Sequence, residues 1–147
     1  MVSDFAERVV LEARDWIGTP YRHQCSTKGA GADCLGVLLG IWRHLYGQVP
    51  TFIPAYTPDW SEAGQAEVLL TAAQAHLVPA DKTAARGDVI LFRMHNGSVA
   101  KHLGILTDVA PQIQFVHAYS GHGVVESPLS QPWQRRTVAR FRFPERT

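Results

Sequence analysis

The spacing of apolar residues predicts helices in the first half of the chain. Over residues 4 to 17, apolar side chains recur at intervals of three and four positions until Gly18, as on one face of a helix. A second stretch begins at Cys34 and ends at Gly47, and it is apolar on most of its sides. Because Asp33 is a good N-cap residue, we expect a central buried helix that begins at Cys34.

The rest of the first half predicts one more helix and two loops. Residues 61 to 77 carry apolar side chains near one stripe and fit a third helix. Residues 18 to 33 contain glycine and proline without periodicity, and residues 48 to 60 interleave proline with aromatic residues. The second loop is either a surface loop that closes the edge of the core or a wall of a binding cleft; its aromatic residues are Phe52, Tyr56 and Trp60.

After Pro79 the pattern changes to short β-like segments separated by turns. Five segments are candidates for strands: Asp88 to Phe92, Lys101 to Thr107, Ile113 to Ala118, Gly123 to Ser127 and Val138 to Phe143. The last segment alternates, and the arginines in and before it predict a solvated strand face: Arg135, Arg136, Arg140 and Arg142. Helices first and antiparallel strands afterwards predict an α+β fold, with N-terminal helices packed on a sheet of about five strands.

Composition and charge narrow the classes of function. The 147 residues fit a single domain over residues 1 to 147, and 46% hydrophobic against 18% charged residues exclude intrinsic disorder. A formal net charge of +1 argues against nucleic acid as a partner. No apolar run approaches the roughly 18 residues of a membrane span, and the N-terminus lacks the pattern of a secretion signal. We therefore expect no membrane insertion and synthesis in the cytoplasm.

The two cysteines fit neither a disulfide framework nor a zinc motif. Cys25 and Cys34 are separated by eight residues, so we expect two free thiols. At the first turn of the predicted helix, unpaired backbone N–H groups and the helix dipole would favour the Cys34 thiolate. Such positions lower the pKa of a thiol from about 8.5 to roughly 3.5–7.5. Cys34 is therefore a candidate nucleophile, although its position alone favours a small buried core residue.

Two histidines are candidates for the base that a cysteine nucleophile needs. His102 begins one predicted strand, and His117 lies late in the next. A tight turn over Asp108 to Pro111 would place the two histidines directly opposite each other, with Cβ atoms about 4.5–5.5 Å apart on one sheet face. One ring would take the thiol proton, and the other would hold the tautomer of the first. A register slip of one residue would send one ring to the other face.

A zinc site is the competing interpretation of the histidines. His95, His102, His117 and His122 are available, but they lack the paired spacing of zinc motifs and no carboxylate accompanies them. We therefore expect no metal ion and no other cofactor. Among the remaining histidines, His23 is the candidate for lining a cleft.

Five short motifs follow one another in an order that is typical of one family. They are Gly18-Thr19-Pro20-Tyr21, Gly31-Ala32-Asp33-Cys34-Leu35-Gly36-Val37, Gly87-Asp88-Val89-Ile90-Leu91-Phe92, His102-Leu103-Gly104-Ile105 and Val116-His117-Ala118. With these motifs the sequence resembles the NlpC/P60 cell-wall cysteine peptidases over most of residues 4 to 127. It is most similar to the short versions in phage tails and gene transfer agents, for which Tyr21-Arg22-His23-Gln24 and Asp33-Cys34-Leu35-Gly36 are typical.

The resemblance implies a papain-like α+β fold and a peptidase activity. It implies that Cys34, at a helix start, faces His102 and His117 on the sheet. It also implies hydrolysis of an amide in peptidoglycan stem peptides, commonly between D-glutamate and diaminopimelate. By the same analogy Tyr21 shapes the oxyanion region, while Asp33 contacts substrate or secures the helix start. Alternatively, Tyr21 only packs under the loop and Asp33 is only a cap.

One position departs from the pattern of the family. Members that act on cell walls usually carry serine after the nucleophile, where this chain has Leu35, and Cys25 has no fixed family role. Because no secretion signal accompanies a substrate outside the cytoplasm, we expect delivery in a particle, as a tail-tip or baseplate component that binds neighbouring tail proteins. A host enzyme released by lysis, or a chain that has lost its signal, would have the same sequence features. Two other interpretations stay open: an inactive structural adaptor in a baseplate, and an amidase or acyltransferase that uses the same cysteine and histidines.

Overall fold

The structure is a computed structural model that describes residues 4–48, 68–93 and 100–145. Several residues singled out in the sequence lie outside these ranges. They are the loop aromatics Phe52, Tyr56 and Trp60, the first part of the helix predicted over residues 61 to 77, and His95.

The described residues of the first half of the chain form three helices, as the apolar spacing predicts. They are α1 (Asp4–Asp15), α2 (Cys34–Tyr46) and α4 (Val68–His76). Helix α2 begins and ends where its capping residues predict: Asp33 is the N-cap, and Gly47 closes the helix with a φ of 88°, a left-handed conformation that glycine adopts without strain. Among the described residues, no helix has the length and apolar character that crossing a membrane requires.

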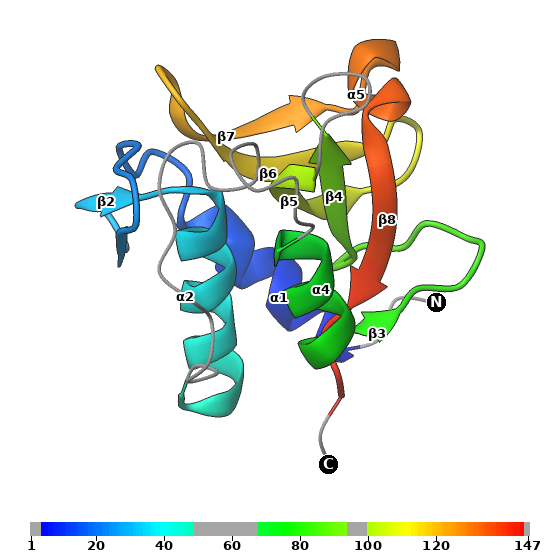
Figure 1. Ribbon diagram of the computed structural model, residues 1–147, viewed down its shortest axis with the longest axis horizontal. Coiled ribbons are helices and arrows are strands. Elements are labelled where there is room, and N and C mark those ends of the chain that lie inside the picture. The colour runs from blue at the N-terminus through cyan, green and yellow to red at the C-terminus, as the bar shows by residue number, and fades with distance from the viewer. Residues whose placement is uncertain (1–3, 49–67, 94–99, 146–147) are drawn as a thin grey trace.

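The second half of the chain forms one antiparallel sheet (Figure 1). Its six strands lie in the order β3-β8-β4-β5-β6-β7, and every neighbouring pair is antiparallel. Five strands coincide with the predicted segments, and the sixth, β3, is two residues long and pairs with β8. The strands are β3 (Val78–Pro79), β4 (Val89–Arg93), β5 (Ala100–Asp108), β6 (Gln114–Tyr119), β7 (Gly123–Pro128) and β8 (Thr137–Arg142).

Short elements inside the predicted loops were not expected. A hairpin of two-residue strands, β1 (Ser26–Thr27) and β2 (Gly31–Ala32), lies in the loop before α2. A five-residue helix, α5 (Gln131–Arg135), lies between β7 and β8. Elements this short carry no periodic pattern that a sequence reading can detect.

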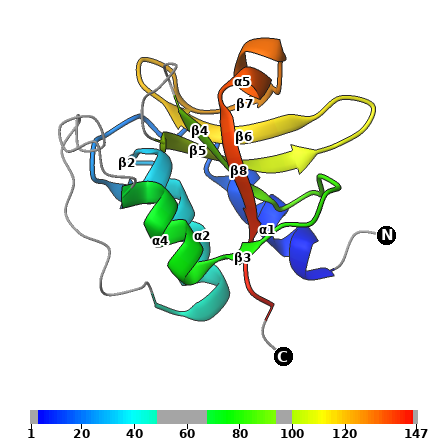
Figure 2. The same cartoon turned by 45° about the vertical axis from the view of Figure 1, so that its right-hand side comes forward.

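The sheet separates two apolar clusters. On one face, residues such as Leu91, Leu103 and Ile105 pack against α1, α2 and α4 and form the larger cluster. On the other face, Phe92 and Phe115 form a smaller cluster with Leu106, and Trp133 of α5 packs against it. The two views agree that α1, α2 and α4 lie together and that α5 lies at the opposite end of the molecule (Figures 1 and 2).

The register of the β5–β6 hairpin differs from the predicted one. Ile105 pairs with Val116, whereas a tight turn over residues 108 to 111 would pair it with Gln114. The connection is longer than that turn, over residues 109 to 113, and a β-bulge lies between Leu106 and Asp108. Because the register moves by two residues, each side chain keeps its predicted face.

The prediction of a solvated arginine face on β8 is wrong for two of its arginines. Arg140 Nη1 lies 2.7 Å from Asp88 Oδ2, and Arg142 Nε lies 3.1 Å from Asp88 Oδ1. Asp88 is buried, with 1% of its surface exposed. A buried carboxylate requires charged partners, which the alternation of β8 supplies on this face.

Candidate active site

The loop before α2 is held against the first turn of that helix. Asp33 Oδ1 accepts a hydrogen bond from the Gly36 N–H at 2.8 Å, and its Oδ2 accepts one from the Gln24 N–H at 2.7 Å. A Cβ atom on Gly36 would lie 1.9 Å from the carbonyl oxygen of Cys25, so only glycine permits this close approach. Asp33 and Gly36 together fix the start of α2, and therefore the position of Cys34.

Cys34 lies against strand β5. Its sulfur is 4.0 Å from the carbonyl oxygen of Lys101, the residue that precedes His102. Among the described residues, this carbonyl is the hydrogen-bond partner of the Cys34 side chain, in place of the His102 ring that the sequence reading expects. The structure thus places the thiol beside the backbone that carries His102.

Strands β5 and β6 separate where the histidines lie. The pairing of β5 with β6 runs from the loop that connects them to the pair Ile105 and Val116. Beyond this pair, β5 is paired with β4 only and β6 with β7 only. His102 pairs with Phe92 of β4, and His117 pairs with Val125 of β7. The predicted direct pairing of the two histidines is therefore wrong, because the longer connection shifts the register.

The two histidine rings nevertheless meet across this separation. His102 Nε2 lies 2.8 Å from His117 Nδ1, which is the distance of a hydrogen bond. The shift of two residues leaves both side chains on one face and makes the pair diagonal rather than direct. His117 Nε2 in turn lies 3.0 Å from Ser127 Oγ. The structure therefore contains a chain of three polar side chains that runs from His102 through His117 to Ser127.

Both rings are buried among aromatic side chains. The ring of Trp133 is stacked on that of His102 at 5.5 Å, and it meets the His117 ring edge-on at 5.2 Å. Burial, with a smaller contribution from His117, lowers the pKa of His102 to about 3. Burial, with a smaller contribution from His122, lowers the pKa of His117 to about 4. Both rings are therefore neutral at neutral pH.

The expected lowering of the thiol pKa does not occur. Burial, with a smaller contribution from the carboxylate of Asp33, raises the pKa of Cys34 to about 12. Backbone N–H groups of Leu103, Leu35 and Cys34 itself act in the opposite direction, and their effect is smaller. Desolvation of the sulfur outweighs the helix start. The resting site therefore holds a neutral thiol beside the backbone of β5, and the imidazole of His102 is neutral as well.

Tyr21 also lies near the nucleophile. It bridges to Ala32 next to the start of α2, and its side chain is partly exposed. Burial, followed by the charges of Cys34 and Asp33, raises the pKa of the Tyr21 phenol. His23 Nδ1 lies 3.8 Å from Asp33 Oδ2 on the same loop. The structure brings Tyr21 near Cys34 and His23 near Asp33, and the oxyanion role of Tyr21 and the cleft position of His23 stay predictions.

Leu35, which stands where members that act on cell walls usually carry serine, lies in the core. Its side chain is 4% exposed and belongs to the larger apolar cluster. A residue buried in this way offers no surface to a ligand. The side chain after the nucleophile is part of the core in this chain.

Two residues of the site were missed by the sequence reading. Ser127 contacts His117 from β7, and Trp133 contacts both histidine rings from α5. Each depends on a strand pairing or a short helix that leaves no local pattern. The order of the motifs indicated the histidines but not the residues behind them.

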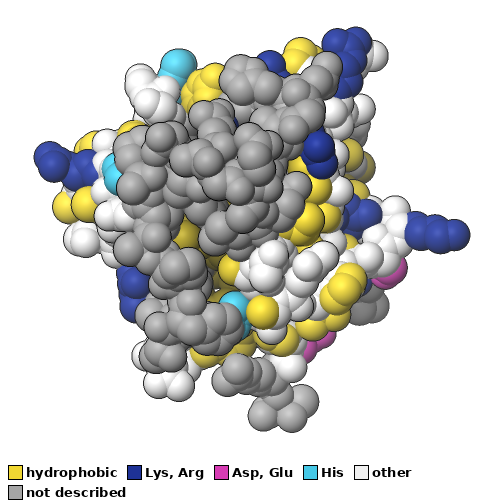
Figure 3. Space-filling model, viewed as in Figure 1, with side chains coloured by type: hydrophobic (Ala, Val, Ile, Leu, Met, Phe, Trp, Pro, Cys, Tyr) yellow, Lys and Arg dark blue, Asp and Glu magenta, His cyan; other side chains and the backbone are white. Residues whose placement is uncertain are grey.

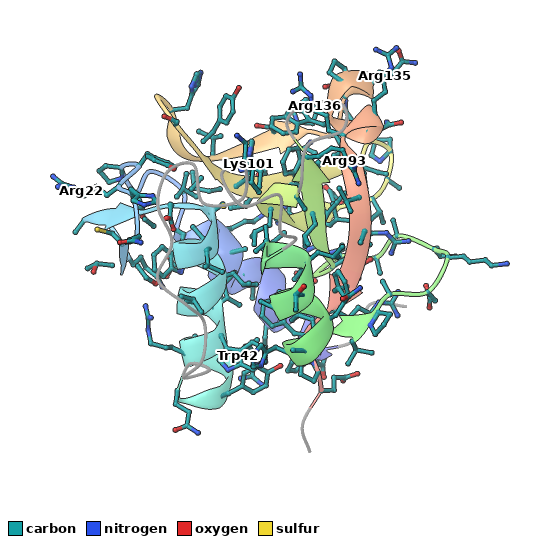
Figure 4. All side chains as sticks on the ribbon, in the orientation of Figure 1. Arg22, Trp42, Arg93, Lys101, Arg135 and Arg136 are labelled. Atoms are coloured by element: carbon teal, nitrogen blue, oxygen red, sulfur yellow. The ribbon has the colours of Figure 1, made fainter. Side chains whose placement is uncertain are left out.

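Basic side chains lie around the site. Figure 4 shows Lys101 above β5, Arg93 and Arg136 near α5, and Arg22 on the side of β2. Arg136 lies over the Trp133 ring at 5.7 Å, and its backbone carbonyl accepts a hydrogen bond from the Arg93 N–H at 2.8 Å. In the same orientation, Lys and Arg side chains border the face shown in Figure 3.

The histidines do not gather into a metal site within the described residues. No three His, Cys, Asp or Glu side chains in the described ranges are arranged to hold a metal ion. His95, the fourth member of the zinc hypothesis, lies outside these ranges.

A comparison with known protein families shows to which family the chain belongs. The family model described as the NlpC/P60 family matches residues 18–142. This chain belongs to the NlpC/P60 family. The roles of Cys34, His102 and His117 as site residues stay predictions. The narrower likeness to phage-tail and gene-transfer-agent members stays a prediction.

Two curated relatives of the chain are named as enzymes that act on murein, the cell-wall polymer. The NlpC/P60 chain is 31% identical over 134 residues to the Murein DD-endopeptidase MepS/Murein LD-carboxypeptidase of Escherichia coli strain K12, covering 90% of this chain and 60% of that protein. The protein of the same name from Escherichia coli O157:H7 gives the same values. The chain therefore spans 60% of the length of the curated relatives it matches.

Solved structures share the fold. A lipoprotein-like NLP/P60 family protein of Staphylococcus aureus has a TM-score of 0.64 at 21% identity, covering 99% of this chain and 43% of the other. An NlpC/P60 family protein of Bacillus cereus has a TM-score of 0.64 at 17% identity, covering 94% and 40%. NlpC1 of Trichomonas vaginalis has a TM-score of 0.62 at 18% identity, covering 97% and 45%. The chain has the α+β fold of the NlpC/P60 proteins.

Proposed function

We propose that this NlpC/P60 chain is a cysteine peptidase that hydrolyses amide bonds in peptidoglycan stem peptides. The observation that carries the proposal is the contact of Cys34, at the start of α2, with the backbone of β5 next to His102, whose ring meets that of His117 on β6. The chain belongs to the NlpC/P60 family, and its Escherichia coli relatives are named as murein endopeptidases. Both findings support peptidoglycan as the substrate.

The neutral states of the buried Cys34 thiol and His102 ring determine how the reaction starts. Since the pKa of the thiol is about 12 and that of His102 about 3, the thiolate is formed during attack rather than before it. His102 accepts the thiol proton as the sulfur forms a bond to the amide carbonyl carbon. His102 then protonates the departing amine as the C–N bond breaks, and a thioester with Cys34 remains. In the second step, His102 deprotonates a water molecule, which hydrolyses this thioester.

The start of α2 supplies the groups that stabilise the intermediate. Its first backbone N–H groups, including those of Cys34 and Leu35, point toward the sulfur. They act on the oxygen that becomes negative in the tetrahedral intermediate, where each donor contributes about 2.7–4 kcal/mol. Tyr21 lies close enough to Cys34 to help shape this region.

The basic residues around the site bear on the substrate. Stem peptides carry free carboxylates, and Arg93 and Arg136 have no carboxylate partner among the described residues. The family resemblance implies the bond between D-glutamate and diaminopimelate, where a free carboxylate lies next to the amide, whereas the Escherichia coli relatives are named for DD-endopeptidase and LD-carboxypeptidase activities. Defined stem peptides that contain each bond distinguish the two.

We further propose that the protein acts as a tail-tip or baseplate component of a phage or gene transfer agent. The motifs Tyr21-Arg22-His23-Gln24 and Asp33-Cys34-Leu35-Gly36 support this role. Mass spectrometry of purified particles is the test: we expect the chain among the structural proteins. Particles that lack the chain would overturn the assembly role and leave the peptidase proposal intact.

The peptidase proposal is tested with purified peptidoglycan and with defined stem peptides. We expect mass spectrometry to find fragments cut at one amide after incubation with the wild-type protein and with Cys25→Ala, and none with Cys34→Ala. Undiminished release by Cys34→Ala would refute the role of this cysteine. No release by any variant favours the inactive adaptor, and turnover of other amides or esters alone favours the amidase or acyltransferase.

A further inference from the structure

Ser127 ends the chain of polar side chains that begins at His102. Its Oγ lies 3.0 Å from His117 Nε2, and His117 Nδ1 lies 2.8 Å from His102 Nε2. Ser127 stands on β7 opposite Phe115, one strand pair away from the hairpin that carries the histidines. The family motifs found in the sequence do not include it.

The contacts allow two proton arrangements. A neutral imidazole has one N–H donor and one acceptor nitrogen, and both rings are neutral because they are buried. In the first arrangement, His102 Nε2–H donates to His117 Nδ1, and His117 Nε2–H donates to Ser127 Oγ. In the second, the Ser127 hydroxyl donates to His117 Nε2, and His117 Nδ1–H donates to His102 Nε2.

Only the first arrangement gives a base. There the Nδ1 atom of His102 keeps its lone pair and can accept the thiol proton. In the second arrangement, the same atom is protonated and cannot accept a proton from Cys34. The direction of the last hydrogen bond, at Ser127, therefore decides whether His102 can work as proposed.

The surroundings of His117 indicate that Ser127, rather than water, sets the direction of this hydrogen bond. His117 is 2% exposed, and its ring is surrounded by Phe115, Tyr119 and Trp133, so bulk water does not take the place of the hydroxyl. Ser127 itself is partly exposed, so its own proton can be donated to solvent. The hydroxyl is then left as an acceptor for His117.

We propose that Ser127 is a positioning residue that holds His117, and through it His102, in the tautomer with the proton on Nε2. This inference rests on the proposed function of Cys34 and His102, and it adds a fourth residue that acts through His117 without touching the substrate. A hydroxyl that accepts the last proton orients both rings at once.

The first test reads the tautomers directly. Two-dimensional proton–nitrogen NMR of the imidazole rings distinguishes a protonated Nε2 from a protonated Nδ1. We expect both rings of the wild-type protein to carry the proton on Nε2. We expect His117 of Ser127→Ala to show a mixture, and Ser127→Thr, which keeps the hydroxyl, to match the wild type. A protonated Nδ1 on His102 of the wild type would overturn the proposal.

The second test reads the consequence for peptide cleavage. Loss of one oriented hydrogen bond corresponds to a fall of about threefold to tenfold in kcat for Ser127→Ala, with Ser127→Thr within about twofold of the wild type. Equal kcat values for Ser127→Ala and the wild type would contradict the positioning role. If the wild type cleaves no stem peptide, the proposed function fails, and the NMR measurement alone decides the inference.

Discussion

The Nε2 atom of His102 lies 2.8 Å from the Nδ1 atom of His117, although their strands are no longer paired with each other at that point. The hydrogen bond thus closes a separation in the sheet at the place where α2 begins. Helix α2 packs against β5 and β6 from the helical side, where Cys34 reaches the backbone of β5. The two rings pack against Phe92, Phe115 and Trp133 of the smaller cluster on the other face.

Removing His117 is expected to slow catalysis more than it weakens substrate binding. In His117→Ala, the His102 ring loses the partner that fixes its tautomer and orientation, and we expect kcat to fall by about 10–100-fold. Initial rates of cleavage of a defined stem peptide measure the effect. His44→Gln changes an exposed histidine on α2 and is expected to keep the wild-type rate. A change confined to KM would argue against the orienting role.

The thiol of Cys34 is expected to react slowly at neutral pH. Only the thiolate is alkylated, and the pKa of Cys34 is raised to about 12, so the alkylation rate should rise about tenfold for each pH unit between pH 7 and 9. Iodoacetamide labelling of Cys25→Ser, in which Cys34 is the remaining cysteine, measures this rate by mass spectrometry. A rate that is constant over this range would reveal a preformed thiolate–imidazolium pair instead.

The sequence predicts the elements that have a periodic pattern. Helices α1 and α2 and the five longer strands follow from the spacing of apolar residues, and the start of α2 follows from the cap Asp33. Elements of two to five residues, such as β3 and α5, bury too few side chains to leave a pattern.

The candidate site divides in the same way. The order of the motifs and the alternation of the strands indicate that His102 and His117 share a face, and an even register error preserves that relation. Burial raises the pKa of Cys34, whose sulfur lies against β5, a strand far away along the chain. A local rule about helix starts cannot include burial by a distant strand, so the predicted thiolate was wrong.

Acid is expected to destabilise the fold through the histidine pair. The folded-state pKa values of about 3 and about 4 lie below the ordinary value of 6.5, so the unfolded chain binds protons first as the pH falls. Above pH 6.5 neither state binds them and no stability is lost. Between pH 6.5 and 5, each ring should remove about 2 kcal/mol from the free energy of unfolding.

Urea denaturation at pH 7 and pH 5 measures this loss. The wild-type protein should lose more stability between the two pH values than His117→Asn, which lacks one of the two buried rings. The comparison uses only the difference between pH values, so the general cost of the substitution cancels. Equal losses in both proteins would show that His117 does not remain neutral in the folded state.

Asp88 is expected to be a structural residue rather than part of the site. Its buried carboxylate accepts hydrogen bonds from Arg140, Arg142 and the backbone N–H of Ala85, and it ties β8 to the start of β4. Asp88→Ala leaves two guanidinium groups without this partner and should lower the free energy of unfolding by about 3 kcal/mol.

Asp81→Ala is the matched control for Asp88→Ala. Asp81 also pairs with Arg142, at 2.9 Å, but its side chain is 67% exposed, and water replaces a partner lost at the surface. Urea denaturation should therefore show a large drop in midpoint for Asp88→Ala and none for Asp81→Ala. Cleavage by Asp88→Ala, measured below its unfolding transition, should keep the wild-type kcat, because no contact links Asp88 to Cys34 or His102 among the described residues. A loss of kcat in well-folded Asp88→Ala would instead connect the arginine face of β8 to the chemistry at β5.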